Sequence, residues 1–228
     1  MNKVTVSVGI SFVLLVSGQA LSVPLATWTG TGTTFNGGGE TVGYAFLTGS
    51  QGGLATALGA FDLGGDGLGQ IDLGLWDATG TNLLASTTVS SFTNPTLDPV
   101  GSGTDGFRYG AIAPVLLAAN TTYVVGAFGY DLATFDVSGF SMTPGFTFLG
   151  TRYVVNGFGL AFPNQNFPAA TANGVFGPNV IVQAVPGAPE VDPLKFQLPF
   201  AFICLSLALT SRQKDSSSRA GLSAVKQR

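Results

Sequence analysis

Short runs of apolar residues alternate with turn-forming residues along the middle of the chain. In one run, Val42, Tyr44 and Phe46 are large and apolar, and this period of two places them on one face of a strand. The same pattern predicts strands over 42–47, 54–61, 71–76, 83–89, 107–112, 122–128, 146–149, 153–155 and 180–184. Gly and Asp at 64–67 and 77–80 predict tight turns, because both accept the backbone angles that such turns require. No helical period is visible in this region.

Many short strands with regular turn signals indicate an all-β fold, an antiparallel β-sandwich of the jelly-roll or immunoglobulin-like kind. We expect a single domain over residues 21–184, with a long loop over 163–178 packed on one end. Tyr44, Trp76 and Tyr123 fall at strand positions, so we expect them in the core. Some aromatic residues could instead form a platform on which sugar rings stack. The candidates are Trp28, Trp76, Tyr44, Tyr109, Tyr123, Tyr130 and Tyr153.

Residues 1–20 have the three-part layout of a secretory signal peptide. Lys3 precedes an apolar stretch over 4–16, and small residues follow at Gly18 and Ala20. This arrangement predicts cleavage after Ala20 and export through the Sec translocase. The apolar stretch is shorter than the ~20 residues that a helix needs to cross a bilayer, which argues against a permanent anchor.

A second apolar segment lies near the other end of the chain. Residues 185–195 form a linker rich in Pro and acidic residues, residues 196–211 are apolar, and residues 212–228 are basic and rich in Ser. Basic residues hold the adjoining end of a membrane helix in the cytoplasm, so the pattern predicts a hydrophobic helix with a cytoplasmic tail. A buried core helix is the alternative, although it would need neither the linker nor the basic tail. Cys204 lies within this segment and is interpreted as one more small apolar side chain.

The C-terminal region resembles the sorting signal of bacterial PEP-CTERM proteins, in which a Pro-Glu motif, an apolar stretch and a basic cluster follow one another. Here the motif is Pro189 and Glu190, followed by Val191 in place of a second proline, and the basic tail continues to Arg228, which is longer than usual. The resemblance implies recognition by an exosortase-type enzyme, processing near Pro189 and Glu190, transient insertion in the inner membrane, and an association with exopolysaccharide systems.

The middle of the chain also resembles an uncharacterised β-sandwich domain that is common in PEP-CTERM and other exported bacterial proteins. The resemblance covers roughly residues 34–128. It is carried by the stretches 42–46, 58–62, 66–68, 74–77, 107–109 and 117–123. No established activity accompanies that domain, so the resemblance implies a fold and a compartment only.

Composition and charge narrow the range of partners. Charged residues make up 9% of the chain against about 25% in typical soluble domains, and 33 Gly favour strands joined by turns over helices. Between Leu21 and Pro189 there are nine acidic residues but only two basic ones, Arg108 and Arg152. Nucleic acids and anionic membranes are bound through Lys and Arg, so we do not expect this acidic region to bind either.

The available side chains exclude several classes of enzyme. The chain has no His and one Cys, which excludes a Ser-His-Asp triad, a Cys-His pair and an imidazole metal ligand. A polysaccharide-processing enzyme would need two carboxylates facing one cleft. Glu40 is the only glutamate of residues 21–184, and the aspartates there mostly adjoin Gly in turns. We therefore expect a protein that is not an enzyme.

One cluster of acids could bind a hard metal ion. Asp62 and Asp66 flank a Gly-rich turn, and such a turn can offer carboxylate and carbonyl oxygens to calcium. The spacing fits neither an EF-hand loop nor a repeated nonapeptide, and Asp at the start of a turn commonly bonds to the backbone instead. Asp62 and Asp66 are kept as candidate calcium ligands, and no other cofactor is expected.

These features predict a non-catalytic structural protein of the cell surface or extracellular matrix, which is exported and then sorted by an exosortase-type enzyme. The alternative is a carbohydrate-binding or adhesive module that presents aromatic side chains and is braced by calcium. Both hypotheses place the protein in the cell envelope or outside the cell, with extracellular polysaccharide as the expected partner. The fold alone does not choose between them, because sandwiches serve structure, binding and hydrolysis alike.

Overall fold

The computed structural model describes residues 21–30, 32–35, 39–101, 103–129, 133–135, 137–167 and 175–183. These residues form an all-β structure, in which η1 (Leu63–Gly65), one turn of 3-10 helix, is the only helix. They belong to the first of two compact units of the chain, Met1–Pro186. No helix in the described ranges has the length and apolar character needed to cross a membrane. The predicted signal peptide with Ala20, the motif at Pro189 and Glu190, and the segments 196–211 and 212–228 lie outside these ranges.

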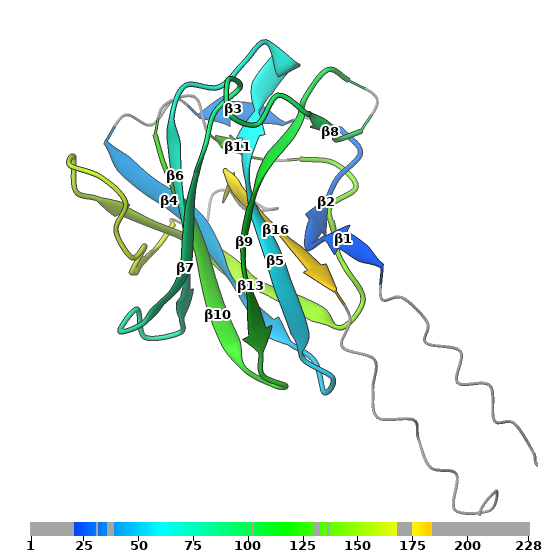
Figure 1. Ribbon diagram of the computed structural model, residues 1–228, viewed down its shortest axis with the longest axis vertical. Coiled ribbons are helices and arrows are strands. Elements are labelled where there is room, and N and C mark those ends of the chain that lie inside the picture. Colours follow the sequence, from blue (N-terminus) through cyan, green and yellow to red (C-terminus); the bar gives the residue numbers. More distant parts are fainter. Residues whose placement is uncertain are drawn as a thin grey trace, which may run out of the picture. The chain divides into compact units, whose positions relative to one another are not determined.

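Two large antiparallel sheets contain most of the strands (Figure 1). The five-stranded sheet has the order β1 (Ser22–Pro24), β16 (Pro178–Gln183), β5 (Gly53–Asp62), β9 (Gly106–Leu117) and β8 (Asp98–Pro99). The six-stranded sheet has the order β14 (Gln165–Asn166), β13 (Phe146–Val155), β4 (Glu40–Thr48), β10 (Thr122–Phe128), β6 (Ile71–Asp77) and β7 (Leu83–Val89). Two small sheets consist of β15 (Val175–Phe176), β11 (Ala133–Phe135) and β3 (Thr33–Phe35), and of β12 (Ser141–Met142) and β2 (Ala26–Thr27).

The pairing of the strands is nested along the chain. β1 pairs with β16, β4 with β10, β5 with β9 and β6 with β7, all antiparallel, so early strands pair with late ones. β16 also pairs with β5, and β10 with β6, which joins the four pairs into two sheets. Successive pairs belong to alternate sheets, and β13 is added outside β4. This arrangement of two antiparallel sheets is consistent with a β-sandwich.

The strands predicted from the apolar alternation are confirmed, with one correction. The prediction of separate strands over 146–149 and 153–155 is wrong, because β13 runs through both. Its register shifts between Phe148 and Gly150, and Gly150 has a φ of +125°, so a β-bulge interrupts the alternation without ending the strand. The predicted loop over 163–178 contains β14 and β15. Such two-residue strands are too short to show a period.

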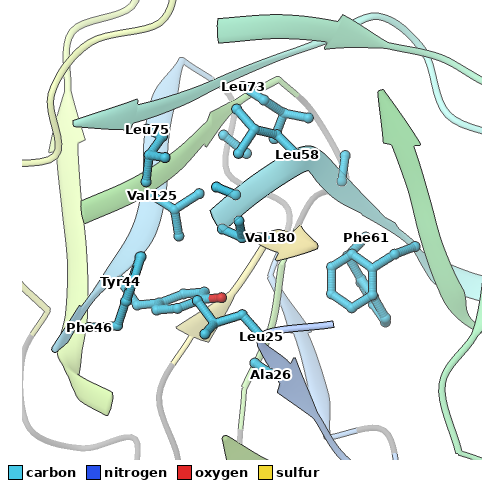
Figure 2. Close-up of a cluster of buried hydrophobic side chains, with 14 of the residues drawn as sticks. Leu25, Ala26, Tyr44, Phe46, Leu58, Phe61, Leu73, Leu75, Val125 and Val180 are labelled. Atoms are coloured by element: carbon cyan, nitrogen blue, oxygen red, sulfur yellow. The ribbon is translucent and has the colours of Figure 1, made fainter. Parts of the chain in front are cut away.

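A hydrophobic core draws side chains from both large sheets (Figure 2). Tyr44 and Phe46 of β4 are fully buried, as their alternation predicts. Leu58 of β5 and Val180 of β16, from the other sheet, belong to the same cluster, as does Tyr123, which was predicted in the core. Each large side chain buried in this way stabilises the fold by about 1.5–3 kcal/mol relative to an exposed one.

Trp76 is buried as predicted, but outside that core cluster. A Cβ atom added at Gly74 or Gly126 would meet the indole ring, so the two glycines leave the space that the ring occupies. Phe162 packs edge-on against the indole, with the ring centroids 6.0 Å apart. Phe162, the residue just before the predicted loop, therefore covers part of the six-stranded sheet.

Candidate functional site

Asp62, the first predicted calcium ligand, is held in a buried ion pair. Its Oδ2 accepts a hydrogen bond from Arg108 Nε at 2.6 Å, and the two side chains are 1% and 7% exposed, respectively. Arg108 Nη1 also donates to the backbone oxygens of Asn94 at 3.1 Å and Pro95 at 2.6 Å. The β5–β9 register places Arg108 opposite Ala60, on the strand that ends at Asp62. The guanidinium group of Arg108 on β9 thus connects the end of β5 with the loop before β8.

Asp66, the second predicted calcium ligand, is exposed just after η1. The turn itself is held by acceptors on other residues: Gly67 N donates to Asp62 Oδ1 at 3.3 Å, and Gly64 N donates to Asp105 Oδ1 at 2.6 Å. Within the described ranges, no group of three or more His, Cys, Asp or Glu is placed to hold a metal ion. Calcium binding at Asp62 and Asp66 stays a prediction, and the ion would compete with Arg108 for Asp62.

Asn179 on β16 is a second buried polar centre. Its Oδ1 accepts hydrogen bonds from Ala26 N at 3.1 Å, Val180 N at 2.9 Å and the Tyr44 hydroxyl at 3.3 Å. Its Nδ2 donates to Ala26 O at 2.8 Å, so the side chain serves as a strand partner for Ala26. Burial raises the pKa of Tyr44, which keeps this hydroxyl protonated as a donor.

A pocket lies beside Asn179, where the segment 24–28 meets β8 and β9. Its volume is about 130 Å³, and its lining residues are Pro24, Ala26, Thr27, Trp28, Asp98, Pro99, Val100, Gly101, Phe107, Tyr109 and Asn179. Aromatic rings form much of the lining: the centroids of Trp28 and Phe107 are 5.3 Å apart, and those of Phe107 and Tyr109 are 5.8 Å apart. Trp28 and Phe107 are 4% and 1% exposed and belong to the core, so Tyr109 is the most accessible of the three rings.

Tyr109 and Asp98 supply the polar chemistry of this pocket. The Tyr109 hydroxyl oxygen is buried, and no hydrogen bond of standard distance and angle reaches it from the described residues, although the Asn179 side chain lies close enough to lower its pKa. Burial and, secondarily, the nearby Asp98 charge raise the pKa of Tyr109 well above its ordinary value, and partial burial raises the pKa of Asp98. A buried hydroxyl without a partner costs about 1–3 kcal/mol, so the site favours a water molecule or a ligand that bonds to it.

No family model, curated protein or solved structure matched the chain. The kind of ligand that this pocket could bind is therefore inferred from its lining residues and its volume alone. Its volume of about 130 Å³ is below the roughly 300–1,000 Å³ of most small-molecule sites. At ~30 Å³ for each water molecule, it holds about four waters or one polar edge of a larger molecule. Asp98 is its one carboxylate, whereas glycoside hydrolysis uses a pair.

The structure brings together two of the seven aromatic residues considered as a sugar platform. Trp28 and Tyr109 share the pocket, whereas Tyr153 packs against Phe167 with centroids 5.3 Å apart. Tyr44, Trp76 and Tyr123 are buried elsewhere, and Tyr130 lies outside the described residues. The sequence did not single out Asp98 or Asn179, because both reach the pocket only through long-range pairing of strands. A weak signal was present in Asp98-Pro99, which interrupts an otherwise uncharged stretch.

Proposed function

We propose that this chain is an exported, non-catalytic structural protein of the cell surface or extracellular matrix, associated with exopolysaccharide. The observation that carries the proposal is the order of segments: signal-like residues 1–20, an all-β region, the Pro189-Glu190 motif, the apolar segment 196–211 and a basic tail. The ion pair of Asp62 with Arg108 supports the non-catalytic part of the proposal, because this buried carboxylate is already bonded to a guanidinium group. The Sec translocase and an exosortase-type enzyme are the proposed processing partners.

The proposed domain is a jelly roll. The nested pairs of β1 with β16, β4 with β10, β5 with β9 and β6 with β7 support this assignment, because a jelly roll is a long antiparallel hairpin folded over into two sheets. An immunoglobulin-like fold pairs neighbouring strands in a different order. β13 is an addition to this plan. It lies between β10 and β16 in the sequence, and it extends the six-stranded sheet beyond β4.

Processing at the motif is tested by intact mass and cell fractionation in a host that carries the sorting enzyme and in the same host without it. We expect loss of the chain beyond the Pro189-Glu190 region and release to the surface only when the enzyme is present. Glu190→Ala should abolish this loss, whereas Asp192→Ala, a neighbouring acid outside the motif, should not. Retention of the full tail in the inner membrane of both hosts would make segment 196–211 an ordinary anchor.

A second candidate function is carbohydrate binding, which the pocket favours. Sugars present flat apolar faces and hydroxyl groups, and the pocket offers the half-buried Tyr109 ring and the Asp98 carboxylate, with Trp28 reaching the lining although it is only 4% exposed. The small volume suits the recognition of one sugar edge or chain end, so we expect weak binding. Calcium at Asp62 and Asp66 belongs to this alternative and is not required by the pocket.

Binding is tested by NMR titration of the protein with glucose and galactose. We expect shifts confined to residues around Tyr109, and we expect Asp98→Ala to weaken them because it removes an acceptor at an exposed position. Asp66→Ala, which removes an exposed acid from a different turn, is the control and should leave the titration unchanged. Equal behaviour of the two variants, or no response of the unsubstituted protein, would eliminate this candidate.

A further inference from the structure

The first and last described strands bring both ends of the domain to one end of the sheets. Ser22, the first residue of β1, pairs with Gln183, the last residue of β16. A Cβ atom at Gly53, where β5 starts, would lie 2.8 Å from the Phe146 ring and 3.5 Å from Gln183 O, so the starts of β5 and β13 lie there as well. We call this end of the sheets, which these four residues define, the terminal pole.

A pocket of about 630 Å³ opens at the terminal pole, and this volume falls within the roughly 300–1,000 Å³ of most small-molecule sites. Its described lining consists of uncharged residues, namely Leu21, Val23, Gly49, Ser50, Gln51, Gly52, Thr143, Pro144, Gly145 and Phe146. Leu21 is 80% exposed and Pro144 is exposed as well, so apolar groups of the wall face the surroundings. Apolar surface in contact with water is unfavourable, so this pocket favours an apolar occupant.

The described acids are concentrated toward the opposite end of the sheets. Gly53 pairs with Leu117 and Asp62 pairs with Gly106, so β5 and β9 run from the terminal pole to that end. All the described acids except Asp77 lie in that half, namely Glu40, Asp62, Asp66, Asp72, Asp98 and Asp105. Asp77 lies near the terminal pole on β6, which is three strands from β13 in the order of the sheet. The pocket is therefore at the less charged end of the described domain.

The length of the chain after Gln183 limits how far the terminal pole can lie from a membrane. Residues 184–195 separate Gln183 from the apolar segment 196–211, and an extended chain of this length spans about 40 Å at most. Insertion of that segment, which belongs to the proposed function, keeps the terminal pole within this distance of the bilayer. Because anionic lipids repel acidic side chains, the terminal pole is also the end that meets the least electrostatic repulsion there.

We propose that the terminal pole is a membrane-contacting face, with the acyl chain of a bilayer lipid in its pocket. The inference rests on the proposed insertion of segment 196–211, and it adds a second, apolar contact that the folded domain makes itself. This contact needs no basic side chain, which agrees with a region that has only two bases to offer to lipid head groups. It holds the domain close to the bilayer until the tail is removed.

Quenching of tryptophan fluorescence by brominated acyl chains tests this contact. The full chain is reconstituted in phosphatidylcholine vesicles with and without bromine, and flotation of the vesicles measures its attachment. Gln51→Trp puts the probe at an exposed position of the pocket lining, and Phe158→Trp puts it at a fully exposed position after β13, at the opposite end. We expect bromine to reduce the emission added by Gln51→Trp by roughly half or more, because a side chain at the boundary of head groups and acyl chains lies close to the bromine atoms. The emission added by Phe158→Trp should not change.

A second pair of variants, each combined with Gln51→Trp, adds a charge at one end of the domain. Pro144→Glu puts a carboxylate at an exposed position of the pocket and should weaken the quenching, because a charge is unfavourable among acyl chains. Thr96→Glu puts the same charge in the exposed loop before β8 and should leave the quenching unchanged. Equal quenching of the two probes in protein that floats, or equal effects of the two glutamates, would overturn this inference but not the proposed anchor. Protein that does not float would overturn the proposed insertion of segment 196–211, and this inference with it.

Discussion

Replacing Arg108 by methionine is expected to reduce the free energy of unfolding by about 3–5 kcal/mol. The Asp62 carboxylate is 1% exposed and loses its charged partner in this variant, so it becomes an uncompensated buried charge. The backbone oxygens of Asn94 and Pro95 lose their donor at the same time. A loss of this size is a large part of the total stability of a typical domain, which is about 5–15 kcal/mol.

Urea unfolding of the purified protein measures this effect, and the double variant Asp62→Leu/Arg108→Met separates the ion pair from packing. Because an apolar pair of similar volume can replace a buried ion pair at little cost, we expect the double variant to be more stable than Arg108→Met alone. Arg152→Met is the matched control, since no salt bridge is formed by Arg152 with any described residue. Equal losses for the two arginine variants would contradict the structural role of the pair.

Replacing Asn179 by leucine is expected to cost about 2–4 kcal/mol, the second largest loss among these variants. Leucine has nearly the same shape, but it leaves the backbone N–H and C=O of Ala26 without the bonds of 3.1 and 2.8 Å that the amide supplies. Both groups sit in a buried region, so water does not replace the lost partner. We expect hydrogen exchange of the Ala26 amide to accelerate more than that of the core strands.

The control for this variant is Gln183→Ala on the same strand. Gln183 Nε2 donates to Ser22 Oγ at 2.8 Å in an exposed position, and the loss of such a bond should change stability by no more than about 0.5 kcal/mol. If Asn179→Leu were as mild as this control, the Asn179 amide would not be the support of the β1–β2 segment.

The identity of the long strands was predictable because it depends on local alternation. Tyr44 and Phe46 are buried because their spacing of two places both side chains on the inner face of the strand. The turns at 64–67 and 77–80 contain glycines that adopt positive φ, as predicted. The failure at β13 has the same origin, since the bulge at Gly150 breaks the period within one strand. The shortest strands contain too few residues to show any period.

The candidate sites depended on contacts that no local pattern contains. Asp62 lies in a Gly-rich turn and resembles a metal ligand in sequence, and only the β5–β9 pairing brings Arg108, 46 positions away, to its carboxylate. Asn179 and Ala26 are 153 positions apart. The pocket likewise needs the segment around Trp28, the strand of Tyr109 and the edge strand with Asp98 to meet.

The sequence by itself determined the strand-rich character of this protein, the faces that are buried and the acidic charge of the middle region, because composition and period two act within a few residues. The tertiary structure decided which polar residues are buried and bonded to distant partners, and which aromatic residues share a pocket. These properties follow from the nested pairing of early strands with late ones, and pairing partners distant in sequence leave no periodic signal along the chain.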